Sequence, residues 1–147
     1  MRTKAVNEVT LEFPSQSRNE GFARSAAACF AAQMDPTLNE LEDIKTSVSE
    51  AVTNAIVHGY PDVIGPVWLK LRVLPGNMLE LIVKDRGRGI PDVEQARQPM
   101  FTTGGEERSG MGFTIMESFM DKVTVRSAVN KGTTVVMRKK LAPRLKK

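Results

Sequence analysis

Three short groups of residues in this chain carry the chemical groups that a magnesium nucleotide requires. Glu50 and Asn54 stand one helical turn apart, Asp85-Arg-Gly-Arg-Gly89 follows an alternating segment, and Gly110-Met-Gly112 opens an apolar one. A carboxylate beside a terminal phosphate can accept a hydroxyl proton, and an amide oxygen can complete the shell of Mg²⁺. Glu50 and Asn54 taken alone are more typical of an ordinary helix surface, and each of the other two groups alone also has an ordinary structural interpretation. Together they predict one ATP site with Glu50 as the base and Asn54 as the metal ligand.

The second group suits the recognition of a flat base. The carboxylate of Asp85 can accept a hydrogen bond from the exocyclic amine of adenine, and Gly87 and Gly89 allow the backbone to approach a ring closely. The same five residues are also typical of an acidic turn with glycines at positive φ. Arg86 and Arg88 add positive charge, and the sequence leaves open whether they face phosphate or solvent.

The third group predicts a phosphate site. A helix that begins with glycines offers unpaired amides and a positive dipole end, and Arg108 can add a charge-assisted contact. A flexible hinge beside a surface arginine is the alternative. Gly110, Met111 and Gly112 are the predicted phosphate-side residues, and Thr133, in a predicted hairpin turn, is a weaker candidate for the base-binding network.

Hydrophobic periodicity indicates the elements that position these groups. Residues 37–40 have capping-box spacing ahead of the clearest amphipathic helix, which carries the candidate base and metal ligand. Alternating runs at 67–73 and 79–83 predict a hairpin, and runs at 123–125 and 133–137 predict another. Between the hairpins we expect a long loop with a short helix near its middle, followed by the apolar helix that the glycines open.

The N-terminal part predicts a strand at residues 9–13 and a helix that ends near Met34. Ser17-Arg-Asn-Glu20 again has capping-box spacing, so we expect the serine to cap this helix. The single cysteine lies among alanines, which predicts a buried thiol and fits a reducing cytoplasm. The expected buried positions of the helix are Phe22, Ala26, Cys29 and Phe30.

Length and composition predict one soluble domain. A chain of 147 residues suffices for one core, and we assign residues 1–141 to the domain and 142–147 to a basic tail. Six cations fall within the last ten residues; without them the chain carries 15 basic and 17 acidic side chains. We therefore expect no direct nucleic-acid binding. No apolar stretch is long enough for a membrane span, so no membrane partner is expected either.

The order of these groups resembles the ATPase superfamily of gyrase, the Hsp90 chaperone, histidine kinases and MutL. More closely, Ser49–Tyr60, Ala96–Thr103 and Glu107–Glu117 look like the anti-sigma-F factors of spore-forming bacteria, with a likeness from about residue 6 to 140. The resemblance implies an α/β (α+β) two-layer sandwich, in which helices cover one face of a mixed, mainly antiparallel sheet. This is the Bergerat ATP-binding fold, with a lid at about 90–109.

The resemblance also implies partners and an activity. A protein of this kind binds and inhibits a sporulation sigma factor and, as a serine kinase, uses ATP and Mg²⁺ to phosphorylate and inactivate an anti-anti-sigma factor. It is a cytoplasmic bacterial homodimer. The roles implied for this chain are base for Glu50, Mg²⁺ ligand for Asn54, adenine reader for Asp85, phosphate contacts for Gly110, Gly112 and Arg108, and partner contact for Arg24.

Two alternatives remain at this stage. A nucleotide-gated protein could bind the sigma factor with little kinase activity, in which case ATP only orders the binding surface. The second alternative is the ATP-binding half of a histidine kinase. It ranks last because 147 residues leave no room for a phospho-accepting helical domain.

Overall fold

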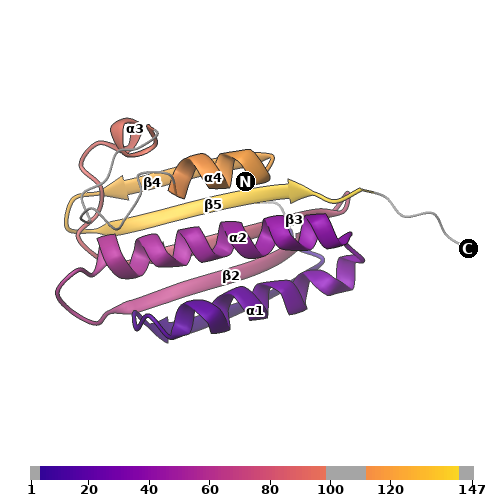
Figure 1. Ribbon diagram of the computed structural model, residues 1–147, viewed down its shortest axis with the longest axis horizontal. Helices are drawn as coiled ribbons and strands as arrows, with labels where there is room; N and C mark the ends of the chain where they lie inside the picture. Colours follow the sequence, from indigo (N-terminus) through magenta and orange to yellow (C-terminus); the bar gives the residue numbers. More distant parts are fainter. Residues whose placement is uncertain (1–3, 99–111, 143–147) are drawn as a thin grey trace, which may run out of the picture.

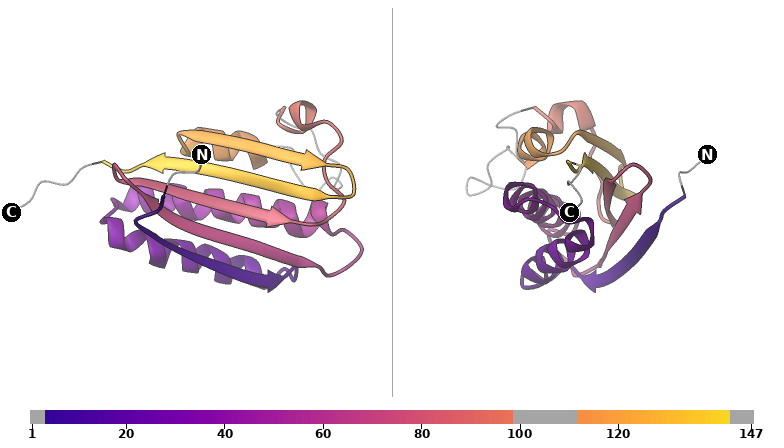
Figure 2. Two further views of the ribbon diagram at one scale, coloured as in Figure 1. Left: turned by 180° about the vertical axis from the view of Figure 1, so that it is seen from behind. Right: turned by 90° about the vertical axis from the view of Figure 1, so that its right-hand side faces the viewer.

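A five-stranded sheet, with helices packed against one face, forms the body of the protein (Figures 1 and 2). The computed structural model describes residues 4–98 and 112–142. The strand order is β1-β2-β3-β5-β4, and each neighbouring pair is antiparallel. The strands are β1 (Asn7–Pro14), β2 (Pro66–Leu74), β3 (Met78–Asp85), β4 (Lys122–Ala128) and β5 (Gly132–Lys140).

Two hairpins build most of this sheet, as the alternating runs predict. Gly76 and Asn77 take positive φ values of 83° and 59° in the turn between β2 and β3. Asn130 and Gly132, at 62° and 106°, serve the turn between β4 and β5. Glycine and asparagine tolerate this left-handed region, so both turns follow from local sequence. The second hairpin brings β5 beside β3, with Thr133 opposite Asp85.

Helix α2 (Leu38–Asn54) confirms the capping-box prediction. Thr37 Oγ1 accepts from the backbone N–H of Glu40, and the Glu40 carboxylate accepts from the N–H of Thr37, at 3.0 and 2.8 Å. Thr37 has the extended backbone that such a cap requires. The helix continues into a π-helical turn, Ala55–Gly59, and π turns inside helices often mark functional sites.

Helix α1 (Asn19–Ala31) departs from the prediction in its cap and its buried face. Arg18, rather than Ser17, precedes the helix with a helical backbone and no side-chain cap, because the preceding turn runs directly into it. Phe22 is 56% exposed, and Cys29 is exposed rather than buried. The buried positions are instead the small residues Ala23, Ala27 and Ala31, which share one side of the helix.

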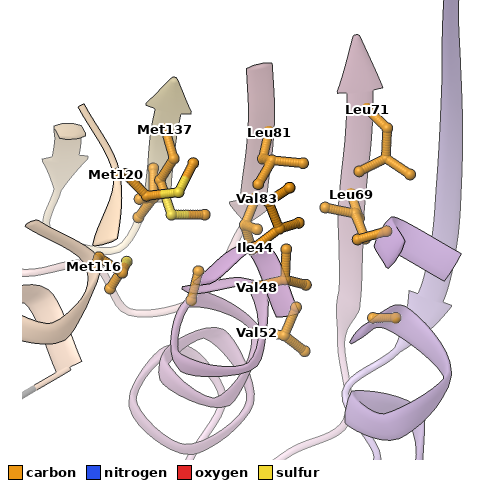
Figure 3. Close-up of a cluster of buried hydrophobic side chains, with 14 of the residues drawn as sticks. Ile44, Val48, Val52, Leu69, Leu71, Leu81, Val83, Met116, Met120 and Met137 are labelled. Carbon is orange, nitrogen blue, oxygen red and sulfur yellow. The ribbon is translucent and has the colours of Figure 1, made fainter. Parts of the chain in front are cut away.

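The core lies between the sheet and the helices (Figure 3). Side chains from α2 point toward the sheet, where the inward residues of β2 and β3 meet them, and methionines of α4 (Gly112–Phe119), the following turn and β5 close the other side. The labelled residues of this cluster are Ile44, Val48, Val52, Leu69, Leu71, Leu81, Val83, Met116, Met120 and Met137. Because these side chains fix α2 against β3, the polar groups at the ends of both elements are held in a constant relation.

On the opposite face of the sheet, four charged side chains form a row across the strands. Arg72 is paired in register with Glu8 on one side and Glu80 on the other, and Glu80 is opposite Arg138. Arg72 donates to Glu80 at 2.5 Å and to Glu8 at 3.0 Å, and Arg138 donates to Glu80 at 2.8 Å. Arg72 and Glu80 are each only 3% exposed.

The α/β two-layer class with helices on one face is therefore confirmed, and all four strand pairings are antiparallel. The short helix expected in the long loop is α3 (Val93–Ala96). Among the helices of residues 4–98 and 112–142, none has both the length and the apolar character needed to cross a membrane.

Candidate nucleotide site

A pocket of about 480 Å³ lies at one end of the sheet, within the size range of small-molecule sites. Its walls come from the end of α2 and its π turn, the end of β3 and the loop after it, α3, the start of α4, and β5. The candidate residues Asn54, Asp85, Gly89, Gly112 and Thr133 line it. Residues from four separated parts of the sequence therefore line the same pocket.

Asp85 is the buried polar group of this pocket, with 5% of its surface exposed. Its carboxylate accepts from the backbone N–H of Gly87 at 2.8 Å and also receives a backbone hydrogen bond from Thr133. Burial raises the pKa of Asp85, and these two amides oppose that rise only in part. A carboxylate can accept about four hydrogen bonds, so these two amides leave acceptor capacity for a ligand donor.

The glycines after Asp85 are required by close backbone contacts. A Cβ at Gly87 would lie 2.0 Å from the carbonyl oxygen of Gly59, and one at Gly89, where φ is 76°, would lie 2.1 Å from that of Ala128. The sequence predicts that these glycines admit a flat base. Within the described residues, the absence of a Cβ instead lets neighbouring backbone carbonyls pack closely on these glycines, and this packing holds the loop beside Asp85.

Ser127 ties this loop to the second hairpin and is missed by sequence reasoning. Its hydroxyl accepts from the N–H of Ile90 at 2.7 Å, lies 2.7 Å from the hydroxyl of Thr133, and bonds the carbonyl of Gly132 at 3.0 Å. Asn130 adds a backbone bond to Arg88 at 2.7 Å. A serine in a strand gives no motif, because its partners depend on the register of β4 against β5.

Glu50 and Asn54 lie together at the start of α4. A Cβ placed on Gly112 would be 3.1 Å from Asn54 Nδ2 and 3.3 Å from Glu50 Oε1. The helix spacing therefore puts a carboxylate and an amide on the same side of α2, facing the first residue of α4. A Cβ at position 112 would therefore contact both groups tightly, and they would have to shift by a few tenths of an ångström to admit it.

His58 and the two arginines have separate environments. His58 lines the pocket. Arg88 also lines the pocket, and its Nε donates to the carbonyl of His58 at 2.9 Å. Arg86 lies instead over the ring of Trp68, 5.0 Å from its centroid, with Lys84 at 5.8 Å. Of the two arginines of the Asp-Arg-Gly-Arg-Gly motif, one therefore lies at the pocket and the other lies away from it.

The remaining candidates lie apart from the pocket or outside the described residues. Arg24 is on α1, does not line the pocket, and forms a 3.6 Å ion pair with Glu20. Arg108, Gly110 and Met111, with most of the expected lid, lie outside the described residues. Of the predicted phosphate-side group, Gly112 alone is described.

The donor set fits a magnesium nucleotide. Mg²⁺ in nucleotide sites takes one or two protein oxygens and completes its shell with phosphates and water, and the amide of Asn54 is such an oxygen. Among residues 4–98 and 112–142 no cluster of three or more His, Cys, Asp or Glu side chains is placed to hold a metal by itself. A metal delivered with a nucleotide suits this arrangement, while Asp85 and the apolar wall of Ala51, Val83 and Ile90 suit a base.

The sequence is similar to proteins of known class over nearly its full length. The family model described as "Histidine kinase-like ATPase domain" matches residues 13–139. An anti-sigma F factor of Geobacillus kaustophilus (strain HTA426) is 58% identical over 138 residues, covering 92% of this chain and 94% of that protein. One of Thermoanaerobacter sp. (strain X514) is 54% identical over 135 residues, covering 91% and 94%. Every residue that lines the pocket falls within the matched family range.

Solved structures share the fold at low sequence identity. The RsbU and RsbW domains of Rv1364c from Mycobacterium tuberculosis match with a TM-score of 0.66 and 18% identity, over 92% of this chain and 32% of that one. Full-length ShkA in complex with AMPPNP matches with a TM-score of 0.58 and 15% identity, over 96% and 33%. These likenesses bear on the fold alone.

Proposed function

The chain belongs to the anti-sigma F factors, within the histidine kinase-like ATPase family, and from that premise we propose that it is both a sigma-factor inhibitor and a protein serine kinase. The observation that carries the kinase proposal is the pairing of Glu50 with Asn54 against Gly112, where Asn54 and Gly112 line the pocket that also holds the buried carboxylate of Asp85. A general base and a metal ligand then address the phosphate end of one ATP molecule, and an adenine-binding carboxylate addresses the other end.

The proposed transfer needs little covalent chemistry from the protein. A serine hydroxyl of an anti-anti-sigma factor attacks the γ-phosphorus, so a new P–O bond forms as the bond to the β–γ bridging oxygen breaks and ADP leaves. Glu50 accepts the proton of the serine hydroxyl. Asn54 would hold Mg²⁺, and the bound metal would supply charge neutralisation at the phosphates. Asp85 accepts from the adenine amine and keeps the nucleotide in register.

The partners and the assembly are proposed from the family. The chain inhibits a sporulation sigma factor, and phosphorylation of the anti-anti-sigma factor prevents that protein from releasing it. Arg24 is the proposed partner contact, supported by its place on the exposed side of α1, where its side chain is 44% accessible. A homodimer in the bacterial cytoplasm is proposed on the same ground.

A phosphoryl-transfer assay tests the kinase proposal. γ-Labelled Mg-ATP is incubated with the anti-anti-sigma factor and with wild type, Glu50→Gln or Asn54→Ala. Glu42→Gln, an exposed position on the same helix, is the matched control. We expect Glu50→Gln to slow transfer by about 1,000-fold, within the range for loss of a general base, while Glu42→Gln transfers normally.

Two results would contradict parts of this proposal. Normal transfer by Glu50→Gln would remove Glu50 from the role of base. ATP binding without any transfer by the wild type would overturn the kinase and leave a nucleotide-gated inhibitor. That protein would be recognised by sigma-factor binding that differs between ATP and ADP.

A further inference from the structure

Helix α3 forms one wall of the nucleotide pocket. Asp92, which caps the helix, and Gln95 and Ala96 within it all line the pocket, together with Ile90 and Pro91 just before it. Figure 1 shows α3 at the same end of the molecule as the C-terminal end of α2 and the start of α4. A shift of α3 would therefore change the shape of the pocket directly.

This wall cannot hold its own position. α3 is four residues long and contains no buried residue, and a helix of one turn has no independent stability in water. Its internal support consists of the Asp92 cap on Gln95 at 3.0 Å and the backbone bonds of Ala96 and Arg97. Only Ile90 and Ala96 of this segment pack, partly buried, against the core. Its place must depend on contacts with other elements.

Arg97, directly after α3, supplies such contacts. Its guanidinium forms an ion pair with Glu117 on α4, where Nε donates to the carboxylate at 3.1 Å and Nη2 donates as well. Nη2 also donates to the carbonyl of Val123 on β4 at 3.1 Å. One side chain thus attaches α3 to a helix and a strand. The planar fork of arginine suits this double attachment in a way that lysine does not.

Helix α4, at the other end of this attachment, contacts the proposed catalytic residues. Phe113 and Met116 of α4 are buried in the core, at 7% and 0% exposure, so α4 is held rigidly. Its first residue, Gly112, packs on Glu50 and Asn54. Helix α4 therefore connects the proposed catalytic pair, at its start, to the ion pair that fixes the opposite wall, near its end.

We propose that Arg97 and Glu117 act as a positioning pair that sets the affinity and residence time of the nucleotide, and that neither takes part in proton or phosphoryl transfer. This inference rests on the proposed nucleotide site. Half-exposed ion pairs add little to global stability, but a segment with few buried contacts depends on the few it has. Loss of the pair should therefore weaken nucleotide binding and leave the folding stability nearly unchanged.

The test uses Arg97→Met, Arg97→Lys, Glu117→Gln and the Arg97→Met/Glu117→Gln double variant of the full chain. Lys45→Met is the matched control, since Lys45 makes a comparable exposed pair with Glu42, at 3.3 Å, away from the pocket. The measurements are the Kd of Mg-ATP by titration calorimetry, the release rate of a fluorescent ATP analogue, the unfolding temperature without nucleotide, and KM and kcat for transfer.

We expect Arg97→Met and Glu117→Gln each to weaken Mg-ATP binding and raise KM by about tenfold, with faster release and an unchanged kcat. The double variant should bind no more weakly than Arg97→Met, because Arg97→Met already removes both the ion pair and the bond to Val123. Arg97→Lys should lie between wild type and Arg97→Met, and Lys45→Met should match wild type.

Unchanged Kd and release in both Arg97→Met and Glu117→Gln would overturn the positioning role. So would a lowered kcat at constant KM, or a double variant whose losses simply add. If Arg97→Met fails to fold, Glu117→Gln still decides the question. Failure of the kinase proposal is distinguishable, because the calorimetric and release measurements need no phosphoryl acceptor, and wild type without transfer still gives a Kd to compare.

Discussion

Strand β3 carries two buried carboxyl groups that the protein treats in opposite ways. Glu80, 3% exposed, lies on the outer face, and Asp85, 5% exposed, ends the strand at the pocket. Burial alone would raise the pKa of Glu80, but hydrogen bonds and charge from Arg72 and Arg138 outweigh it and lower that pKa. Burial raises the pKa of Asp85, and only hydrogen bonds from backbone amides oppose this rise.

The difference separates a stabilising group from a binding group. Glu80 has its oxygens occupied by guanidinium donors, so its charge is compensated within the fold. Asp85 keeps acceptor capacity that the fold leaves to a ligand, at some cost in stability. Two residues five positions apart on one strand thus serve the fold and the site separately, and variants at each should affect only one of them.

Asp85→Asn should give the largest effect. The asparagine amide replaces one of the two acceptor oxygens of the carboxylate with an NH₂ donor. That donor then faces another donor, which is either a backbone N–H or the adenine amine. Mg-ATP affinity should fall on the order of 100- to 1,000-fold, about 3 to 4 kcal/mol, with no loss of folding stability at neutral pH. Calorimetric titration checks the affinity, and binding at wild-type strength would remove Asp85 from the site.

Glu80→Gln should come next and act on stability alone. The change leaves Arg72 buried with half of its pairing, and removing one partner of a buried ion pair costs about 3 kcal/mol. Urea unfolding measures this loss, and the Kd for Mg-ATP serves as the control, which should equal that of wild type. An unchanged unfolding free energy would show that the row of charges on the outer face does not stabilise the sheet.

The two carboxyl groups should also give pH dependences of opposite sign. Glu80 has a folded pKa below its ordinary 4.5, so its contribution to stability is present above that pH and lost as the pH falls through the folded pKa. Asp85 has a folded pKa above its ordinary 3.8, so its contribution is present below that pH and lost as the pH rises through the folded pKa.

Urea unfolding across this acid range separates the two. The deficit of Glu80→Gln relative to wild type should grow as the pH rises toward 4.5 and then level off. Asp85→Asn should gain on wild type as the pH rises above 3.8. Parallel profiles for the two variants would show that their environments do not differ as described.

Arg86→Met should give the smallest effect. Arg86 adjoins Asp85 in sequence, but its guanidinium lies over Trp68 rather than in the pocket. An exposed cation–π contact contributes about 0.5 to 1 kcal/mol, so stability should fall by no more than that and Mg-ATP affinity should be unchanged. Trp68 is the single tryptophan, and its fluorescence reports the loss of the contact. Weakened ATP binding would place Arg86 at the site after all.

Sequence reasoning succeeded where local chemistry decides structure. Thr37 and Glu40 form the predicted capping box because an extended residue precedes a strongly amphipathic helix. The same spacing at Ser17 and Glu20 fails because Arg18 is already helical. On that helix Phe22 and Cys29 were expected inside and are exposed, whereas close packing places small residues such as Ala27 against the core.

Much of the candidate site was readable, because strand ends, glycines and helix spacing are local features. Asp85, Asn54 and Gly112 were named from sequence and meet around one pocket. Ser127 was not, since its role follows from the register between two strands. The π turn that brings His58 to the pocket wall also has no sequence signal of its own.

The most direct test of this separation is the unfolding of wild type, Asp85→Asn and Glu80→Gln at neutral pH, each without Mg-ATP and with the same Mg-ATP concentration, chosen to saturate wild type. A ligand that binds only the folded state raises the unfolding free energy by RT ln(1 + [L]/Kd), so the gain grows with the logarithm of the affinity. We predict that wild type and Glu80→Gln gain equally from Mg-ATP, although Glu80→Gln starts lower, and that Asp85→Asn gains almost nothing. An Asp85→Asn protein stabilised as strongly as wild type would contradict the assignment of this pocket to ATP.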